Sequence, residues 1–462
     1  MPTLPGHLAP TVLTDSAMSS RSSAAASIPQ DGSDDLEKRQ ETQNTQHDET
    51  NTSLPVNVLY PPDMGVRAWL CVFGAWCGFF CSFGYINCLG VFEEYYIVNQ
   101  LASYSASTIS WINSLQTFIL IFSGVVFGRV YDMLGPRPLL FPGAILLALG
   151  VMTTSACKEY YQFILAQGIC ISLGASAIYN ASISAVSGWF IKKRGAALGL
   201  SVSGSSVGGV ILPIVFRQVL KRSNFGWAVR SVGFLMTFAA FVSCFTITSR
   251  FIPKGVQRLD VKRTILMPYM NIKFALIAFG VFLIYWGIFV PIGFIPTHAS
   301  FHGFSASMAD YLVSIMNGTS FFGRVIPGIL ADKLGRFNTF IVCCTTAGVL
   351  ILGLWLPATG HVPIIIFAAF FGFASGASIS LMPALIAEIS PLHEIATRIG
   401  AVSAFVSFAT LSGLPISGAI LRHDHNSFTG VAIFGGVTLI GGCFFVGIAR
   451  LVLSKGKLIA RV

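Results

Sequence analysis

The chain has 462 residues, of which 54% are hydrophobic and only 10% are charged. Soluble domains carry about 25% charged residues, and so few charges cannot cover a water-exposed surface of this size. The composition therefore excludes a string of soluble domains. It predicts a polytopic membrane protein whose main partner is the lipid bilayer.

The net charge of +10 is distributed unevenly along the chain. Residues 1–60 carry eight acidic and three basic side chains, a net of −5, so the remaining residues carry +15. This positive charge lies in short segments between apolar stretches, which is typical of cytoplasmic loops and not of a surface that binds nucleic acid. The first residues are rich in Ser, Thr, Gln and Asp, so we expect a disordered tail.

Twelve apolar stretches have roughly the 20 residues that a membrane-spanning helix needs. The first six are expected near residues 68–91, 108–130, 138–157, 161–185, 196–217 and 226–249. The second six are expected near residues 273–297, 306–330, 338–356, 363–387, 397–421 and 429–452. The widest gap between them divides the chain into six plus six.

This division gives the expected organisation of the chain. It comprises a disordered cytoplasmic tail over 1–65, an N-terminal six-helix bundle over 66–249, a cytoplasmic linker over 250–271, a C-terminal six-helix bundle over 272–452 and a cytoplasmic tail over 453–462. With the tail inside, the inner loops and flanks hold nineteen Lys and Arg residues and the outer ones six, so both termini are expected to be cytoplasmic. The basic cluster of Arg217, Lys221 and Arg222 departs from this rule.

A repeat at a 200-residue offset is the most specific signal in the sequence. Both copies read G-x-x-x-D-x-L-G, and they contain Gly128, Asp132, Leu134 and Gly135 in the first and Gly328, Asp332, Leu334 and Gly335 in the second. Two copies at equivalent points of two halves predict an all-α membrane fold of twelve transmembrane helices in two six-helix bundles related by a pseudo-twofold axis.

Each residue type in the repeat has a physical reason. The first glycine lets the helix end approach its neighbour closely, and the last glycine allows a sharp reversal of the chain. The aspartate can offer its carboxylate to a helix amino terminus or to a basic side chain. The candidate conformational-switch residues are therefore Gly128, Asp132, Gly135, Arg137, Gly328, Asp332, Gly335 and Arg336.

This loop pattern, together with twelve spans, resembles the signature motif of the major facilitator superfamily over residues 66–452. In that family the loop aspartate helps to latch one conformation of a two-state transporter. The resemblance implies this role for Asp132 and, less directly, for Asp332. In the second copy Phe337 replaces the basic residue that Arg137 provides, although Arg336 lies beside it.

Three further stretches resemble the monocarboxylate-porter branch of that family in its fungal form. They are the entry to the first helix at residues 61–69, the connection at residues 189–200 and the proline-rich stretch at residues 291–299. The resemblance implies a small organic acid as substrate.

Arg324 is the first candidate for substrate binding, because a charge inside a span is costly and usually functional. It lies four residues before Gly328, about 6 Å deeper along the helix, and Gly124 takes its place in the first half. An arginine can clamp a carboxylate through two hydrogen bonds. Alternatively, Arg324 snorkels to the cytoplasmic interface or pairs with a loop acid such as Asp332.

The resemblance supports this choice, since the branch holds its substrate carboxylate with an arginine at the matching position. The lysine and aspartate that couple protons in lactate-type carriers fall here at Asn87 and Ser320, so lactate specificity and proton coupling stay open. The full candidate substrate-binding set is Arg324, Asn317, Ser320, Asn87, Tyr85 and Tyr285. Further polar candidates are Asn113, Gln116, Tyr179, Asn180 and Trp286.

The sequence thus predicts a secondary active transporter, not an enzyme, that moves a carboxylate-bearing or anionic organic molecule by alternating access. The alternatives are an efflux carrier for a larger fungal secondary metabolite and a transporter-like nutrient receptor or sensor. We expect a monomer in the plasma membrane. No cofactor and no metal site are expected, because the paired His298 and His302 lack a third ligand and no phosphate-binding loop pattern occurs.

Overall fold

The computed structural model describes residues 63, 65–251, 255, 266–424, 427–457 and 460 of the chain. The predicted tail over 1–65 and the basic residues of the predicted linker from Lys254 to Arg263 therefore lie almost wholly outside the described residues. The side chains of Ala106, Ala306, Ser307 and Asp310 are also outside the description.

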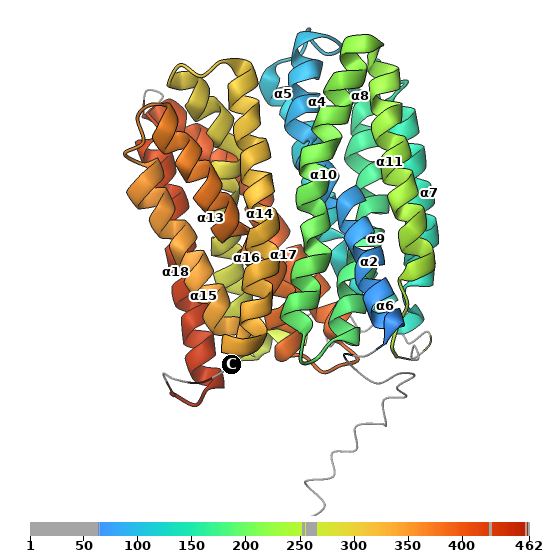
Figure 1. Ribbon diagram of the computed structural model, residues 1–462, viewed down its shortest axis with the longest axis vertical. Coiled ribbons are helices and arrows are strands. Elements are labelled where there is room, and N and C mark those ends of the chain that lie inside the picture. Colours follow the sequence, from blue (N-terminus) through green and yellow to red (C-terminus); the bar gives the residue numbers. More distant parts are fainter. Residues whose placement is uncertain are drawn as a thin grey trace, which may run out of the picture. The chain divides into compact units, whose positions relative to one another are not determined.

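Six helical segments follow one another in the first half of the described chain (Figure 1). They are α2 (Val66–Cys81) with α3 (Phe83–Ile86) and α4 (Leu89–Val98), α5 (Ala106–Phe122) with α6 (Gly124–Leu134), α7 (Arg137–Thr154), α8 (Tyr160–Phe163) with the π-helical η1 (Ile164–Ile171) and α9 (Ser172–Trp189), α10 (Arg194–Arg222) and α11 (Phe225–Thr246).

The second half repeats this plan with six more segments, preceded by the short helix α12 (Met267–Met270) inside the predicted linker. They are α13 (Ile272–Phe301), α14 (Ala306–Leu334), α15 (Arg336–Leu350) with the π-helical η3 (Ile351–Trp355), α16 (His361–Glu388), α17 (Ile395–His423) and α18 (Thr429–Leu453).

Eleven of these segments are long and apolar enough to cross a membrane, counted over the described residues. The remaining segment, α14, has 29 residues, but polar groups such as Asn317 and Arg324 make it less apolar than the others. Every predicted span is helical, and the first runs past its expected end at residue 91 to Val98. The prediction of an all-helical fold of two six-helix bundles is confirmed.

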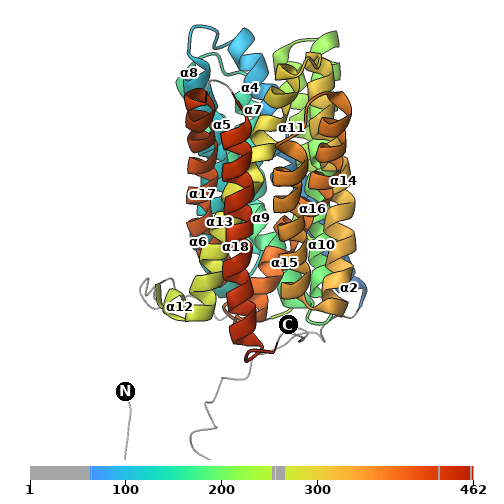
Figure 2. The same cartoon turned by 90° about the vertical axis from the view of Figure 1, so that its left-hand side faces the viewer.

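Figure 1 shows the first-half helices, blue to green, beside the second-half helices, yellow to red. The two halves meet along two seams, one between α10 and α14 and one between α17 and the α5–α6 segment (Figures 1 and 2). We call the end of the bundle that holds the repeat loops at Gly135 and Gly335 the motif end, and the opposite end the far end.

The first span is broken twice, and the breaks bring it close to α10. At the first break the Ser82 hydroxyl donates to the Gly78 carbonyl at 2.6 Å, a local bond that competes with regular helix. Just beyond it, a Cβ on Gly84 would lie 2.9 Å from the Cα of Gly208. This close approach places Asn87, at the second break, next to α10.

The basic cluster that departs from the positive-inside rule lies at the far end of α10. There Arg217 forms an ion pair with Glu94 of α4 at 3.1 Å. An exposed pair of this kind contributes about 1 kcal/mol or less, but it neutralises one of the exceptional charges.

Helix packing within each half relies on glycine, and Gly174 of α9 provides a test. A Cβ there would lie 2.5 Å from the Leu147 nitrogen and 2.6 Å from the Gly143 carbonyl oxygen of α7. Gly174→Val should therefore destabilise the protein by about 2 kcal/mol or more and lower its melting temperature in detergent. The matched control is Gly447→Ala in α18, where a Cβ meets nothing within 4 Å. Equal melting temperatures for the two variants would contradict this account of the packing.

Candidate functional site

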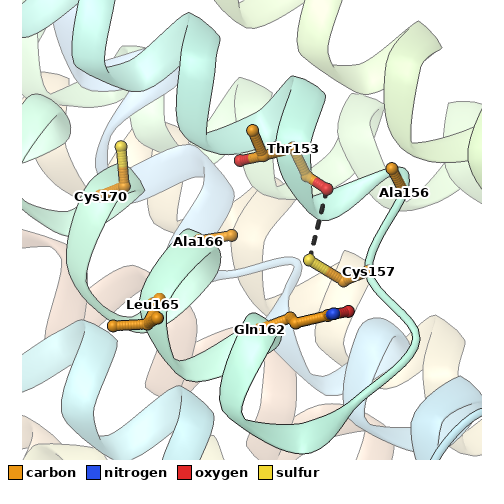
Figure 3. A pocket seen from close by; sticks show the side chains of 7 residues that line it. All are labelled: Thr153, Ala156, Cys157, Gln162, Leu165, Ala166 and Cys170. Atoms are coloured by element: carbon orange, nitrogen blue, oxygen red, sulfur yellow. Dashed lines mark hydrogen bonds between the residues drawn. The ribbon is translucent and has the colours of Figure 1, made fainter.

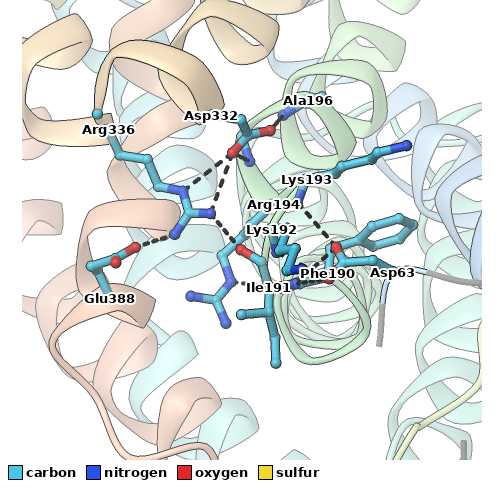
Figure 4. Close-up of polar contacts among 12 residues, drawn as sticks. Asp63, Phe190, Ile191, Lys192, Lys193, Arg194, Ala196, Asp332, Arg336 and Glu388 are labelled. Carbon is cyan, nitrogen blue, oxygen red and sulfur yellow. Dashed lines mark hydrogen bonds and ion pairs between the residues drawn. The ribbon is translucent and has the colours of Figure 1, made fainter. Parts of the chain in front are cut away.

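The repeat aspartate of the second half reaches across to the first half at the motif end. Asp332 accepts hydrogen bonds from the backbone N–H groups of Gly195 at 2.9 Å and Ala196 at 2.8 Å (Figure 4). Both donors belong to the first turn of α10, whose unpaired N–H groups and positive dipole end favour a carboxylate. Asp332 therefore caps a helix of the opposite half.

Arg336 ties this cap to two further elements. Its guanidinium pairs with Asp332 at 3.3 Å, and it also pairs with Glu388 at the end of α16. A third bond runs to the Ile191 carbonyl in the connection between α9 and α10. Because the Asp332 and Arg336 side chains are only 10% and 11% exposed, removing either one would leave a buried charge without its partner.

The repeat aspartate of the first half makes the equivalent contact with α17. Asp132 accepts from the Thr397 backbone N–H at 2.8 Å and from the Thr397 hydroxyl at 2.6 Å. Thr397 lies in the first turn of α17. The two aspartates of the repeat therefore cap one helix each, and each capped helix belongs to the other half.

The glycines of the repeat make these contacts possible. A Cβ on Gly328 would lie 2.6 Å from the Gly195 carbonyl oxygen, and a Cβ on Gly128 would collide with the Ala396 carbonyl. Gly135 and Gly335 have φ of 81° and 99°, a region that other residues rarely adopt. The fourth predicted switch position of the first copy differs, because Arg137 is exposed and forms no ion pair among the described residues.

Arg324 lies on the α10–α14 seam, one helical turn further from the motif end than Gly328. Its side chain is only 4% exposed. Its Nη1 donates to the Val202 carbonyl of α10 at 3.0 Å and to the Ser205 hydroxyl of the same helix. Its Nε has no partner, and no carboxylate pairs with it among the described residues. The predicted alternatives of snorkelling or of pairing with Asp332 are therefore not what the structure shows.

Two of the predicted asparagines, which belong to other spans, pack against the same face of α10. The Asn87 amide donates to the Ser205 carbonyl at 3.2 Å. A Cβ on Gly209, one turn further, would lie 2.8 Å from the Asn87 Cβ and 3.0 Å from the Asn317 Cγ. Three predicted residues from two spans, Asn87 of the first span and Asn317 and Arg324 of α14, thus lie against the middle of α10.

Of the other three predicted substrate-binding residues, one lies near Arg324 and two do not. Tyr285 of α13 is buried close enough to Arg324 to interact with its charge. Ser320 faces α16, because a Cβ on Gly376 would lie 2.7 Å from its hydroxyl. The Tyr85 ring packs against Phe92 inside the first half, 5.4 Å between centroids. The structure brings Tyr285 to the candidate site and leaves Ser320 and Tyr85 in helix packing.

Several buried polar atoms near the seams have no hydrogen-bond partner among the described residues. They include both side-chain amide atoms of Gln116, the Oδ1 of Asn180 and the hydroxyls of Ser206 and Ser403. Asn180 lies against the second seam, where a Cβ on Gly124 would be 3.1 Å from its Oδ1. Unpaired buried polar groups are rare in proteins, and they mark a place where a polar ligand or water fits. Sequence reasoning singled out Gln116 and Asn180 but neither of the two serines.

A separate surface groove of about 460 Å³ lies at the far end between α7 and the α8–η1 segment (Figure 3). It is lined mainly by apolar atoms, and the Cys157 thiol at its edge donates to the Thr153 carbonyl at 3.3 Å. None of the residues that line the groove carries a charge. The described residues also contain no group of three or more metal-ligand side chains.

The family described as Major Facilitator Superfamily matches residues 75–360 and, overlapping with these, residues 277–457.

Several fungal transporters are similar to this chain. "MFS transporter asaE" of Aspergillus flavus is 44% identical over 402 residues, which cover 87% of this chain and 90% of that protein. The "Fujikurins efflux protein" of Gibberella fujikuroi is 40% identical and covers 86% of each chain. The "Aspyridones efflux protein apdF" of Emericella nidulans is also 40% identical, covering 86% of this chain and 80% of that protein.

Two solved structures share the fold at low identity. The human organic anion transporter MFSD10 superposes with a TM-score of 0.66 at 12% identity, covering 84% of this chain and 100% of that chain. The fucose:proton symporter of E. coli superposes with a TM-score of 0.64 at 15% identity, covering 83% and 98%.

The cap on α10 can be tested without any substrate. Asp332→Asn replaces an acceptor-only carboxylate by an amide, which leaves one backbone N–H of α10 without an acceptor. We expect a reporter cysteine at the fully buried Ala197 to react about tenfold faster with a water-soluble thiol reagent in this variant. Glu94→Gln, which removes an exposed acid at the far end, is the control and should leave the rate unchanged. Equal reactivity in both variants would show that the cap does not keep the seam closed.

Proposed function

This chain belongs to the Major Facilitator Superfamily, and we propose that it is an efflux carrier that exports an acidic fungal secondary metabolite. It is a multi-pass membrane transporter and not an enzyme. Two observations support the exported cargo. Two fungal relatives at 40% identity are named as efflux proteins, one for fujikurins and one for aspyridones, and the buried guanidinium of Arg324 supplies a binding group for an acid.

Arg324 is the observation that carries the proposal. A buried cation is stabilised far better by an anion than by neutral groups, and its present partners are a carbonyl and a hydroxyl. A carboxylate or similar acidic group would bridge Nη1 and Nη2 and displace the Ser205 hydroxyl from Nη1. Tyr285 and Asn317, which lie on the neighbouring faces of α13 and α14, would contact the rest of the cargo.

The two aspartate caps would then act as the latch of an alternating-access cycle. By latch we mean the contacts of Asp132 with α17 and of Asp332 with α10. With both caps formed, the halves are joined at the motif end, so this state would admit cargo from the far end only. Breaking both contacts would let the halves rock apart at the motif end. Release of the cargo on the outer side requires the state that the latch stabilises.

We also propose the orientation and the domain limits. The motif end would face the cytoplasm, with both termini on that side, because the basic residues gather there. The membrane would be the plasma membrane, and the working unit a monomer of two bundles spanning residues 66–249 and 272–452. Coupling of export to protons is compatible with this scheme but would not use Asn87 or Ser320, because neither side chain titrates.

Within the superfamily we assign the chain to the monocarboxylate-porter branch. The assignment is supported by the acidic entry to the first span at Asp63 and by the connection that follows Trp189, which contact each other through the Asp63 N–H and the Trp189 carbonyl at 3.1 Å. In this branch the cargo acid would be larger than lactate, consistent with the aromatic side chain of Tyr285 near Arg324.

Removal of the buried cation tests the proposed cargo. The cargo is first identified as the acidic metabolite that a deletion strain retains in its cells and fails to release into the medium. Arg324→Ala should then lower the export rate of this metabolite at least about tenfold, because one charge-assisted clamp is lost. The matched control is Arg217→Ala, an arginine of the far end that pairs with Glu94. Wild-type export by Arg324→Ala would refute the site.

The hydrogen bond from Arg324 to Ser205 leads to a second prediction, in which a substitution strengthens cargo binding. Ser205→Ala removes a group that competes with the cargo for the guanidinium, so we expect the purified protein to bind the exported acid roughly tenfold more tightly. Binding is measured by titration of intrinsic fluorescence, and Ser201→Ala, one turn away in the same helix, is the control. Weaker binding by Ser205→Ala would mean that the serine itself contacts the cargo.

A further inference from the structure

Asp63 lies just before α2 and binds the connection between α9 and α10 (Figure 4). Its carboxylate accepts hydrogen bonds from the backbone N–H groups of Ile191, Lys192 and Lys193, at distances between 3.0 and 3.2 Å. Its own N–H donates to the Trp189 carbonyl at 3.1 Å. One residue thus binds four of the five residues from Trp189 to Lys193 and holds this stretch in a fixed path.

The chemistry of this contact requires a carboxylate. Three successive N–H groups that point to one place form a concave anion-binding site, and an ionised aspartate is acceptor-only with two oxygens. An asparagine would lose one of these acceptors and would point N–H donors at N–H donors. Asp63 also has a φ of 57°, a region that aspartate tolerates better than most other residues.

The same stretch of backbone continues directly into the latch. Gly195 and Ala196, two and three residues after Lys193, donate to Asp332 of the second half. Five of the six backbone N–H groups from residue 191 to residue 196 are therefore bound by two carboxylates, one from each half. The orientation of the donors to Asp332 is set by the path of the residues that Asp63 holds.

We propose that Asp63 is a positioning residue of the latch: it fixes the 191–193 backbone so that the first turn of α10 presents Gly195 and Ala196 to Asp332. Asp63 touches neither the cargo site nor the second half. Its effect reaches the transport cycle only through the closed motif end. This inference rests on the latch described under the proposed function.

Charges around Asp63 favour the same arrangement. Arg194 and Arg250 lie within electrostatic reach of its carboxylate. Arg194 turns back to donate to the Ser187 and Phe190 carbonyls at 3.1 and 2.9 Å, which fixes the other side of the connection. The carboxylate of Asp63 thus offsets the repulsion among the basic residues that begin at Lys192.

The connection to α17 is organised differently. There Glu394, which belongs to the connection itself, pairs with Arg398 at 3.0 Å, and Asp132 binds Thr397. Within the part of the chain that the structure describes, the hydrogen bonds of Asp63 run to the connection that meets Asp332. Its influence should therefore depend on Asp332 and be independent of Asp132.

The test measures the separation of the halves at the motif end in the full-length protein. Nitroxide labels are placed on Phe245→Cys at the end of α11 and Val452→Cys at the end of α18, both exposed, with the partly exposed Cys170 and Cys343 replaced by serine. We expect Asp63→Asn to raise the ratio of long to short inter-label distances about tenfold. The control is Asn271→Ala, which removes the capping side chain of α13 at the same end of the bundle.

A double-mutant cycle separates positioning from general loosening. Asp63→Asn combined with Asp332→Asn should open the motif end little more than Asp332→Asn alone. When Asp63→Asn is combined with Asp132→Asn, the effects of the two substitutions on the free energy of opening should add, because the two contacts are separate. Asp63→Glu, which keeps the charge, should restore part of the short-distance population.

Four outcomes would overturn the inference. One is an unchanged distance distribution in Asp63→Asn while Asp332→Asn opens the motif end. The second is an equal rise in the ratio of long to short distances in Asp63→Asn and Asn271→Ala. The third is that the effects of Asp63→Asn and Asp332→Asn on the free energy of opening add. The fourth is loss of a monodisperse protein in Asp63→Asn but not in Asn271→Ala, which would make the contact a folding requirement. If Asp332→Asn also leaves the distances unchanged, the latch itself fails, and Asp63 loses the role proposed here with it.

Discussion

The structure depends on a carboxylate that caps a helix belonging to the other half of the molecule. An α-helix leaves its first N–H groups unpaired, and in a low-dielectric interior these groups need an acceptor. In α10 and α17 the acceptors are Asp332 and Asp132, which lie in the opposite half. The contact requires backbones to approach closely, which explains the glycines at 128 and 328. Each copy of the repeat therefore supplies one contact between the two halves.

The two seams are similar in construction but differ in charge. The seam of α17 has Gly124 where the seam of α10 has Arg324, so the buried cation is present once. The same α10 helix receives Asp332 at its first turn and Arg324 at Val202 and Ser205. From Gly195 to Ser205 is about 15 Å along one helix at 1.5 Å per residue. A rigid helix thus joins the latch to the candidate cargo site, and Asp63 determines the path of the chain at its start.

Hydropathy and the repeat were sufficient to predict the fold, because spans of about 20 apolar residues and a duplicated loop motif are local signals. They also indicated Arg324, since a charge within a span stands out. They could not identify its partners, because Val202 and Ser205 are 122 and 119 residues away and their approach depends on how α10 crosses α14. Ser320 shows the same limit. It is four residues from Arg324, yet α14 lies between α10 and α16, so helical spacing alone does not say which neighbour a residue faces.

The partners of Arg324 bear on how binding and opening are linked. A ligand shifts a two-state equilibrium only by the difference between its affinities for the two states. An acid that binds Arg324 gains a charge-assisted contact and simultaneously removes a bond between α14 and α10. The gain in cargo binding is therefore offset by a loss of contact between the halves, which brings the closed and open states closer in free energy. Because the two aspartate caps and the α10–α14 bond all stabilise the same state, an acid that breaks only the last of these weakens the motif-end seam without abolishing it.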